Sequence, residues 1–255
     1  MSSKTLTLAK VPMFQGLERS AIKALDARCR WRRVAAKEWV IDYHAPGIDV
    51  FFVVAGSVRV LIHSKTRRDV ILADLDAGGV FGELAPIDGH LRSASVLALS
   101  NAAIAVMPGA VFLEVLQEHS EVSMYVLKML AARIRALDNR VVEYSTFDVR
   151  HRVCCELLRL ARPDPVDPRQ GILSPAPTQA EIAARVSSNR EVVSRTMVSL
   201  VREGYLQRRR NTVVLPDMPA LIRVTRKRKR LIEFAKTPGL ELHPQLFARA
   251  DEAIE

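Results

Sequence analysis

The chain has 255 residues with a formal net charge of +10, and 49% of its residues are hydrophobic. Such a chain can bury one large core or two smaller ones, but no apolar run reaches the roughly 18 residues that a transmembrane helix needs. The three cysteines, Cys29, Cys154 and Cys155, are too few for a disulfide framework and lack metal-ligand spacing. We therefore expect neither a membrane protein nor a disulfide-rich secreted domain, and a reducing cytoplasm is the expected setting.

The positive charge is concentrated in one segment. Residues 178–230 contain 13 lysines and arginines and only 4 acidic residues. Residues 231–255, in contrast, contain 2 basic and 5 acidic residues. A basic segment of this density is typical of contact with a polyanion, above all nucleic acid. A solvated basic face without a partner would have the same composition, and charge alone does not separate the two.

The N-terminal half changes from helical to strand-like spacing. Residues 8–28 have helical spacing, and short runs rich in valine, isoleucine and phenylalanine follow, separated by turns. Many short strands at regular intervals predict a sandwich or barrel. Phe51 to Val54 are core candidates, whereas His44, His63 and His90 are expected in turns, where lone histidines are seldom haem ligands. The predicted strands are residues 39–42, 50–55, 57–62, 70–75, 93–99 and 102–107.

One stretch, residues 81–96, reads FGELAPIDGHLRSASV. It combines the carboxylate of Glu83 and the guanidinium of Arg92 with small residues that let backbone N–H groups approach an anion. Glu83 can accept a hydrogen bond from a sugar hydroxyl, and Arg92 can bind a phosphate with paired hydrogen bonds. A short helix that begins near Glu83 would point its positive end at the same anion. The stretch therefore fits a sugar phosphate better than the alternative, a surface turn with one structural ion pair.

The segments GELA (82–85) and RSASV (92–96) resemble the phosphate-binding cassette of cyclic-nucleotide-binding domains. The resemblance implies that Glu83 holds the ribose 2′-hydroxyl, that Arg92 holds the cyclic phosphate and that Ser93 adds a phosphate or base contact. Pro86 departs from the apolar side chain that is usual at its position. Cyclic AMP is the expected effector, with cyclic GMP as the second choice. The implied ligand contacts are Gly82, Glu83, Leu84, Ala85, Arg92, Ser93 and Ala94.

A long helix is predicted over residues 120–144. Its apolar positions recur at steps of four and three, which approaches a heptad seam and predicts a symmetric dimer. In the resembled proteins this helix also caps the base of the nucleotide. Asp138 or Asn139 would then accept from the adenine amino group or from guanine N1–H and N2–H₂; a solvated charge at Asp138 is an equal alternative. The seam consists of Val122, Val126, Leu130, Ile134, Leu137, Val141 and Tyr144.

A helix-turn-helix is predicted after a proline-rich loop. Thr178 and Glu181 form a capping box, a tight turn follows at residues 187–189, and a second helix runs over residues 190–203. The start of this second helix presents arginine and glutamate, which can bond guanine and cytosine edges in the major groove. Residues 206–215 look like a wing whose arginines would bind phosphates. The expected DNA contacts are Thr178, Ser188, Asn189, Arg190, Glu191, Ser194, Arg195, Arg208, Arg209 and Arg210.

Arg190-Glu191 and Arg195 match the Arg-Glu-x-x-x-Arg of the cyclic-AMP receptor protein family. With the cassette, they identify residues 14–216 as similar to the cyclic-AMP receptor protein / fumarate-nitrate-reduction regulator family of bacterial transcription factors. The resemblance implies an α+β fold: a cyclic-nucleotide-binding β-roll (1–119), a dimerisation helix and hinge (120–147), a winged helix-turn-helix (148–218), and a basic run with a tail (219–255). It implies a homodimer on a palindromic operator, RNA polymerase as a partner, and neither enzymatic activity nor a metal.

Three alternatives stay open at this point. A regulatory subunit or channel module would share the cassette but lack residues 178–215. A member of the same family could respond to another signal, such as a haem-bound gas or an iron–sulfur cluster, although three cysteines without cluster spacing argue against the cluster. The basic run 223–230 fits either an arm that contacts phosphates or the solvated flank of a helix.

Overall fold

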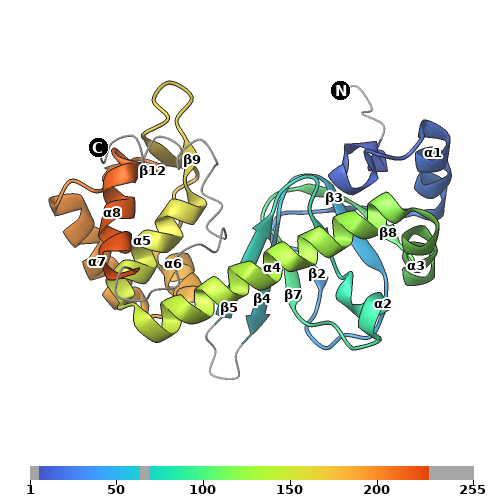
Figure 1. Cartoon of the computed structure of the whole chain (residues 1–255), viewed down its shortest axis with the longest axis horizontal. Helices are drawn as coiled ribbons and strands as arrows, with labels where there is room; N and C mark the ends of the chain where they lie inside the picture. The colour runs from blue at the N-terminus through green and yellow to red at the C-terminus, as the bar shows by residue number, and fades with distance from the viewer. Residues whose placement is uncertain (1–5, 64–68, 230–255) are drawn as a thin grey trace. The chain divides into compact units, whose positions relative to one another are not determined.

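The computed structural model describes residues 6–63 and 69–229 (Figure 1). The chain forms two compact units, Met1–Ala131 and Ala132–Glu255. None of the helices in the described part of the chain is long and apolar enough to cross a membrane.

Two four-stranded antiparallel sheets form the N-terminal unit, which confirms the predicted β-roll. The first sheet has the order β1 (Arg30–Val34), β8 (Ala102–Met107), β3 (Val50–Ala55) and β6 (Val80–Phe81). The second has the order β2 (Trp39–Ile41), β7 (Ser95–Ala98), β4 (Val58–His63) and β5 (Asp69–Leu75).

Strand β3 is buried on both faces, which explains its unbroken apolar run. Phe52 faces a core built with the N-terminal helices, where its ring lies 5.1 Å from that of Phe14. Phe51 faces the other way, into the core between the sheets, and its ring stacks on that of Phe81 at 5.0 Å. The alternation follows from the two-residue period of a strand, and it places Phe51 beside the cassette.

Helices close one end of this unit. They are η1 (Leu8–Lys10), η2 (Pro12–Phe14), α1 (Arg19–Arg28) and α3 (Gly109–Glu118) (Figure 1). An ion pair of 2.5 Å between Arg28 and Glu114 joins α1 to α3. The first turns of the long helix α4 (Ser120–Thr146) belong to the same core, because Val122 and Val126 are buried in it. The predicted seam was therefore wrong at its start. Its exposed apolar part begins further along α4.

A winged helix-turn-helix forms the C-terminal unit, as predicted. Its helices are α5 (Val149–Leu160), α6 (Gln179–Arg185), α7 (Arg190–Arg202) and α8 (Met218–Lys229). Its sheet has the order β11 (Gln207–Arg209), β12 (Thr212–Leu215), β10 (Gly171–Leu173) and β9 (Arg162–Pro163). Val193, Met197 and Leu200, which recur at helical spacing along α7, are all buried, and Gly204 follows the helix with a φ of +81°.

Several elements differ from the predictions. Strand β1 carries three arginines in five residues, so that it has no apolar pattern; its hydrogen bonds come from β8. Strands β9 and β10 lie at the proline-rich loop. They pair with each other, and β12 is the second partner of β10. The sequence of the wing suggests residues 208–211 as its turn, but Arg208 and Arg209 lie in strand β11, and the turn consists of Arg210 and Asn211. Much of the basic run belongs to α8, whereas residues 231–255 lie outside the described residues.

Helix α5 is tied to the end of α7 by a bidentate ion pair. Arg150 donates to both carboxylate oxygens of Glu203, at 2.9 and 2.6 Å, and Ser199 Oγ donates to the same carboxylate at 2.6 Å. The hydrogen bond from Arg150 is the main cause that lowers the pKa of Glu203 to about 2. Because this side chain is 37% exposed, water screens the pair and its contribution to stability is small, about 0.2–1 kcal/mol.

We predict that Glu203→Gln lowers the free energy of unfolding at pH 7 by this small amount. The folded carboxyl has a lower pKa than the unfolded one, which is about 4.3. Its stabilisation is therefore complete above pH 4.3 and is lost as the pH falls towards 2. Urea unfolding of the two proteins between pH 7 and pH 3 should give curves that converge below pH 4.3. A pH-independent difference would contradict the ion pair as its cause.

Candidate functional site

The predicted cassette, residues 81–96, follows the short strand β6. Gly82 has a φ of +80°, and a Cβ atom there would lie 2.8 Å from Nη1 of Arg92 and 3.1 Å from the carbonyl oxygen of Asp49. Only glycine fits this position without strain. Glu83 comes next and is 1% exposed, and the helix α2 (Leu84–Asp88) follows directly. The predicted short helix at Glu83 is confirmed.

Arg92 is the charged centre of the cassette and is only 5% exposed. Its guanidinium donates from Nη1 to the carbonyl oxygen of Gly82 at 2.9 Å and from Nη2 to that of Asp49 at 2.8 Å. The guanidinium carbon lies 5.4 Å from the centre of the Phe51 ring, a cation–π distance. Burial lowers the pKa of Arg92, and the negative charges of Asp49 and Glu83 partly oppose this effect.

This environment favours an anion beside Arg92. Burial penalises the positive charge because it removes water. The hydrogen bonds of the guanidinium go to backbone carbonyls, which carry partial charges, and the carboxylates of Asp49 and Glu83 compensate for burial only in part. An anionic oxygen at the same guanidinium would add a charge-assisted hydrogen bond. The loop before β3 holds the cassette in place: the amide of His44 donates to the carbonyl of Arg92 at 3.0 Å, and the amide of Tyr43 donates to Ser95 Oγ at 2.9 Å.

The structure brings some of the predicted ligand residues together and separates others. Glu83 and Arg92 are both buried and close enough for their charges to interact. Ala85 and Ala94 are buried, whereas Leu84 and Ser93 are exposed. Asp138, which is exposed, and Asn139 belong to the C-terminal unit, so their role towards a base stays a prediction.

Two residues that hold Arg92 were missed by sequence reasoning. Asp49 supplies a carbonyl and an opposing charge, and Phe51 supplies a ring face. Nothing in the sequence marks Asp49, and Phe51 reads as an ordinary core residue. The β3–β6 register, which pairs Phe51 with Phe81, is what places this ring beside the cassette.

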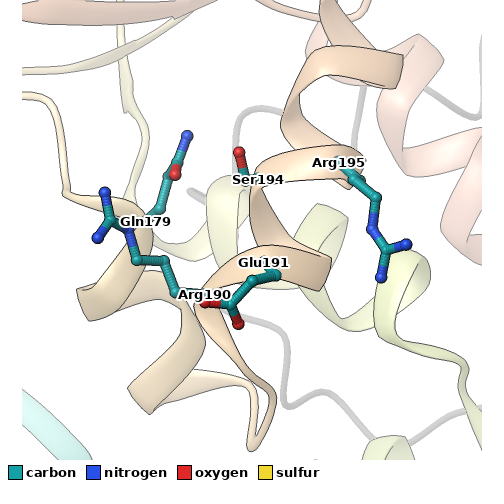
Figure 2. Close-up of a pocket in the computed structure, with 5 residues that line it drawn as sticks. All are labelled: Gln179, Arg190, Glu191, Ser194 and Arg195. Atoms are coloured by element: carbon teal, nitrogen blue, oxygen red, sulfur yellow. The ribbon is translucent and has the colours of Figure 1, made fainter.

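The second candidate site is the start of α7. Asn189 caps this helix by accepting from the amide of Val192 at 2.9 Å, and Thr178 with Glu181 forms the predicted capping box on α6. Both short helices therefore begin at defined residues. Figure 2 shows the surface that results, with side chains from α6 and α7 around a shallow hollow. We call it the recognition face; it consists of Gln179, Arg190, Glu191, Ser194 and Arg195.

The recognition face joins four predicted DNA contacts to one that was missed. Arg190, Glu191 and Arg195 are exposed at the start of α7, and Arg190 extends towards Gln179 of α6 (Figure 2). The first residue of a helix, directly after the N-cap, carries no special sequence signal, and for this reason Gln179 was missed. Thr178 and Asn189 act on the backbone as caps. Two arginines, a glutamate and an amide on one exposed face suit the donors and acceptors of base edges.

The wing carries further positive charge. Arg208, Arg209 and Arg210 are all exposed on the β11–β12 hairpin. Strand β12 is buried and pairs with β10, so the hairpin is fixed to the sheet of the unit. Exposed arginines on a fixed hairpin suit phosphate contacts, which position a protein on DNA without reading its sequence.

The two sites define a DNA-binding protein with a ligand-sensing β-roll. A family model described as a cyclic nucleotide-binding domain matches residues 31–119, and one described as a Crp-like helix-turn-helix domain matches residues 151–224. The cAMP-activated global transcriptional regulator Vfr of Pseudomonas aeruginosa is 32% identical over 202 residues, which cover 76% of this chain and 94% of that protein. The chain therefore belongs to the CRP/FNR family of transcription regulators and is not an enzyme.

Other relatives agree with this assignment. The CRP-like cAMP-activated global transcriptional regulator of Mycobacterium tuberculosis is 26% identical over 220 residues, which cover 86% of this chain and 98% of that one. Two solved structures share the fold. A CooA mutant from Carboxydothermus hydrogenoformans has a TM-score of 0.70 at 20% identity over 88% of this chain and 97% of its own. The c-di-GMP responsive regulator CLP of Xanthomonas campestris has a TM-score of 0.65 at 21% identity, over 78% of this chain and 99% of its own.

Proposed function

We propose that this protein is a homodimeric transcription regulator whose binding to a palindromic operator responds to a cyclic nucleotide, with cyclic AMP as the first candidate. One observation carries the proposal: the buried Arg92, near Glu83, lies in a cassette on the same chain as an exposed recognition face. The first site suits a phosphate with a sugar hydroxyl, and the second suits base edges.

The roles of the cassette residues follow from their chemistry. Arg92 would turn its guanidinium from the carbonyls of Gly82 and Asp49 towards the cyclic phosphate. Glu83 would accept from the ribose 2′-hydroxyl. The relatives named as cAMP-activated support cyclic AMP as the effector. If a phosphate replaced the carbonyl acceptors of Arg92, the cassette would shift. The effector would then make different contacts with the two states of the protein, which it needs in order to favour one of them.

One observation favours a second candidate. The Arg92 guanidinium already has two carbonyl acceptors and an aromatic ring, an arrangement that can be stable without any effector. A family member that binds DNA independently of nucleotide, or that responds to another signal, is therefore the alternative. A fold neighbour described as c-di-GMP responsive makes cyclic di-GMP a ligand to include in the tests.

The dimer proposal is supported by the middle of α4. Leu127, Ile134 and Val141 are 59%, 59% and 62% exposed and recur every seven residues; Leu137, between them, is 55% exposed. An exposed apolar stripe with this period suits a second copy of the same helix. Two recognition faces would then reach successive major grooves about 34 Å apart on a cytoplasmic DNA target.

We predict that cyclic AMP raises the thermal stability of the wild-type protein and leaves Arg92→Ala unchanged. At a ligand concentration 100 times the dissociation constant, one bound ligand stabilises a protein by about 2.7 kcal/mol. Thermal unfolding is measured with cyclic AMP, cyclic GMP and cyclic di-GMP. Arg28→Ala removes an exposed arginine of the same unit and should keep the response. A full response in Arg92→Ala would refute the cassette as the site; a wild-type protein that ignores all three ligands would favour the alternative.

Asp138→Ala tests the proposed base contact. If Asp138 accepts from the base of one of the two nucleotides, the variant should bind that nucleotide more weakly, and the ratio of the cyclic AMP and cyclic GMP affinities should change at least about tenfold, because a hydrogen bond to a charged group contributes about 1.5–3 kcal/mol. Calorimetric titration of both nucleotides gives this ratio. An unchanged ratio would leave Asp138 as a solvated charge on α4.

Arg190→Ala should weaken operator binding by about 1–3 kcal/mol and spare nucleotide binding, because a bidentate arginine discriminates one base pair by this amount. The probe is a duplex selected from a random pool with the wild-type protein, and sedimentation of the complex should give two chains per duplex. Arg202→Ala, at the far end of α7, is the matched control. Equal losses in both variants would mean that Arg190 reads no base.

A further inference from the structure

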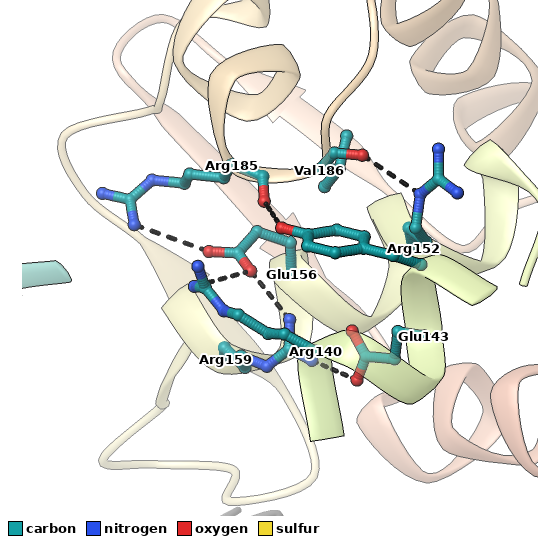
Figure 3. Close-up of polar contacts among 8 residues, drawn as sticks. Arg140, Glu143, Arg152, Glu156, Arg159, Arg185 and Val186 are labelled. Atoms are coloured by element: carbon teal, nitrogen blue, oxygen red, sulfur yellow. Dashed lines mark hydrogen bonds and ion pairs between the residues drawn. The ribbon is translucent and has the colours of Figure 1, made fainter. Parts of the chain in front are cut away.

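A buried cluster of charges lies around the last turns of α4. Glu143 of α4 and Glu156 of α5 expose only 3% and 2% of their side chains. Both carboxylates accept a hydrogen bond from the guanidinium of Arg159, and the bond to Glu156 is 2.8 Å long (Figure 3). The second oxygen of Glu156 lies 3.5 Å from Arg185, the last residue of α6, and Arg140 of α4 lies 3.6 Å from this carboxylate. Three helices thus meet at two glutamates.

Side chains of α4 and α5 also form hydrogen bonds to the backbone of the helix-turn-helix. The hydroxyl of Tyr144 on α4 donates to the carbonyl oxygen of Arg185 at 2.9 Å. Nε of Arg152 on α5 donates to the carbonyl oxygen of Val186 at 3.0 Å, a contact that Figure 3 draws beside the cluster. Arg185 and Val186 end α6, and Asn189, three residues later, caps α7. The two bonds therefore hold the chain at the turn that aims the recognition face.

Stability alone does not account for a cluster of this kind. Burial by itself would lower the pKa of Arg159, but the carboxylates of Glu143 and Glu156 outweigh burial and raise it. Ion pairs repay the cost of desolvation only with good geometry, and apolar residues of equal volume often stabilise a protein as well or better. Buried ion pairs do hold the elements that carry them in one relative orientation, because a displaced partner leaves an uncompensated charge.

We infer that Tyr144 and the Glu143–Glu156–Arg159–Arg185 cluster are positioning residues for DNA reading: they fix the recognition helix α7 to the last turns of α4. A movement of this end of α4 would then be transmitted to α7 through these contacts and would not be lost in the short connection between α4 and α5. The boundary between the two compact units, after Ala131, precedes every residue of the cluster. This inference depends on the proposed DNA-reading role of α7.

Tyr144→Phe is the sharpest test, because it removes one hydroxyl and keeps the ring. We expect the specific affinity for the selected operator duplex to fall about 2- to 10-fold, the range for one hydrogen bond. The affinity for a scrambled duplex of the same length should stay unchanged, because it depends on phosphate contacts. Glu143→Gln, which leaves Arg159 with one carboxylate fewer, should reduce the same specificity ratio.

Ser145→Ala is the matched control. Its hydroxyl, next to Tyr144, donates to the carbonyl of Val141 within the same helix, so its removal should leave the ratio of operator to scrambled affinity at the wild-type value. If Tyr144→Phe lowers the melting temperature but keeps this ratio, the bond is only structural and the inference is wrong. If the wild-type protein itself does not distinguish the two duplexes, the proposed function fails instead. Nucleotide affinity, measured in parallel, should be the same in all variants.

Discussion

The sensor unit depends on one constraint, which is that a buried guanidinium must have acceptors. Arg92 satisfies this constraint with two backbone carbonyls and the ring of Phe51. The constraint explains why the residue before Glu83 is glycine, since a side chain on Gly82 would collide with Arg92. The loop before β3 holds the backbone of the same residue, because the amide of His44 donates to the carbonyl oxygen of Arg92. The cassette is thus a loop folded around one charge.

Much of this architecture can be predicted from local patterns. The capping box at Thr178 and the second helix of the helix-turn-helix, which Asn189 caps, follow from neighbours in sequence, and the sequence predicts both correctly. The Glu83 and Arg92 pair could be identified because the small residues around it make an unusual composition. Local patterns therefore give the helices, most strands and the charged residues of both candidate sites.

Elements that depend on distant partners could not be predicted in this way. Strand β1 has the composition of a surface segment and becomes a strand because β8 pairs with it. Strand β10 lies in a proline-rich stretch and gains its bonds from β12. For the same reason Asp49 was missed: its backbone carbonyl, which any residue could supply, is what reaches Arg92. The burial of Val122 and Val126 likewise depends on the fold around them.

The buried arginines of the two units have different hydrogen-bond acceptors. Arg92 donates to two neutral carbonyls, while the carboxylates of Asp49 and Glu83 act on it as nearby charges, so an anionic oxygen could replace a carbonyl as its hydrogen-bond acceptor. Arg159 is bonded to two glutamates that are themselves buried, and a ligand anion would gain nothing by displacing them. The first arrangement can be exchanged and the second cannot. The proposed function needs both properties, because a ligand would have to change the sensor while the recognition helix keeps its angle to α4, the helix proposed to carry the change.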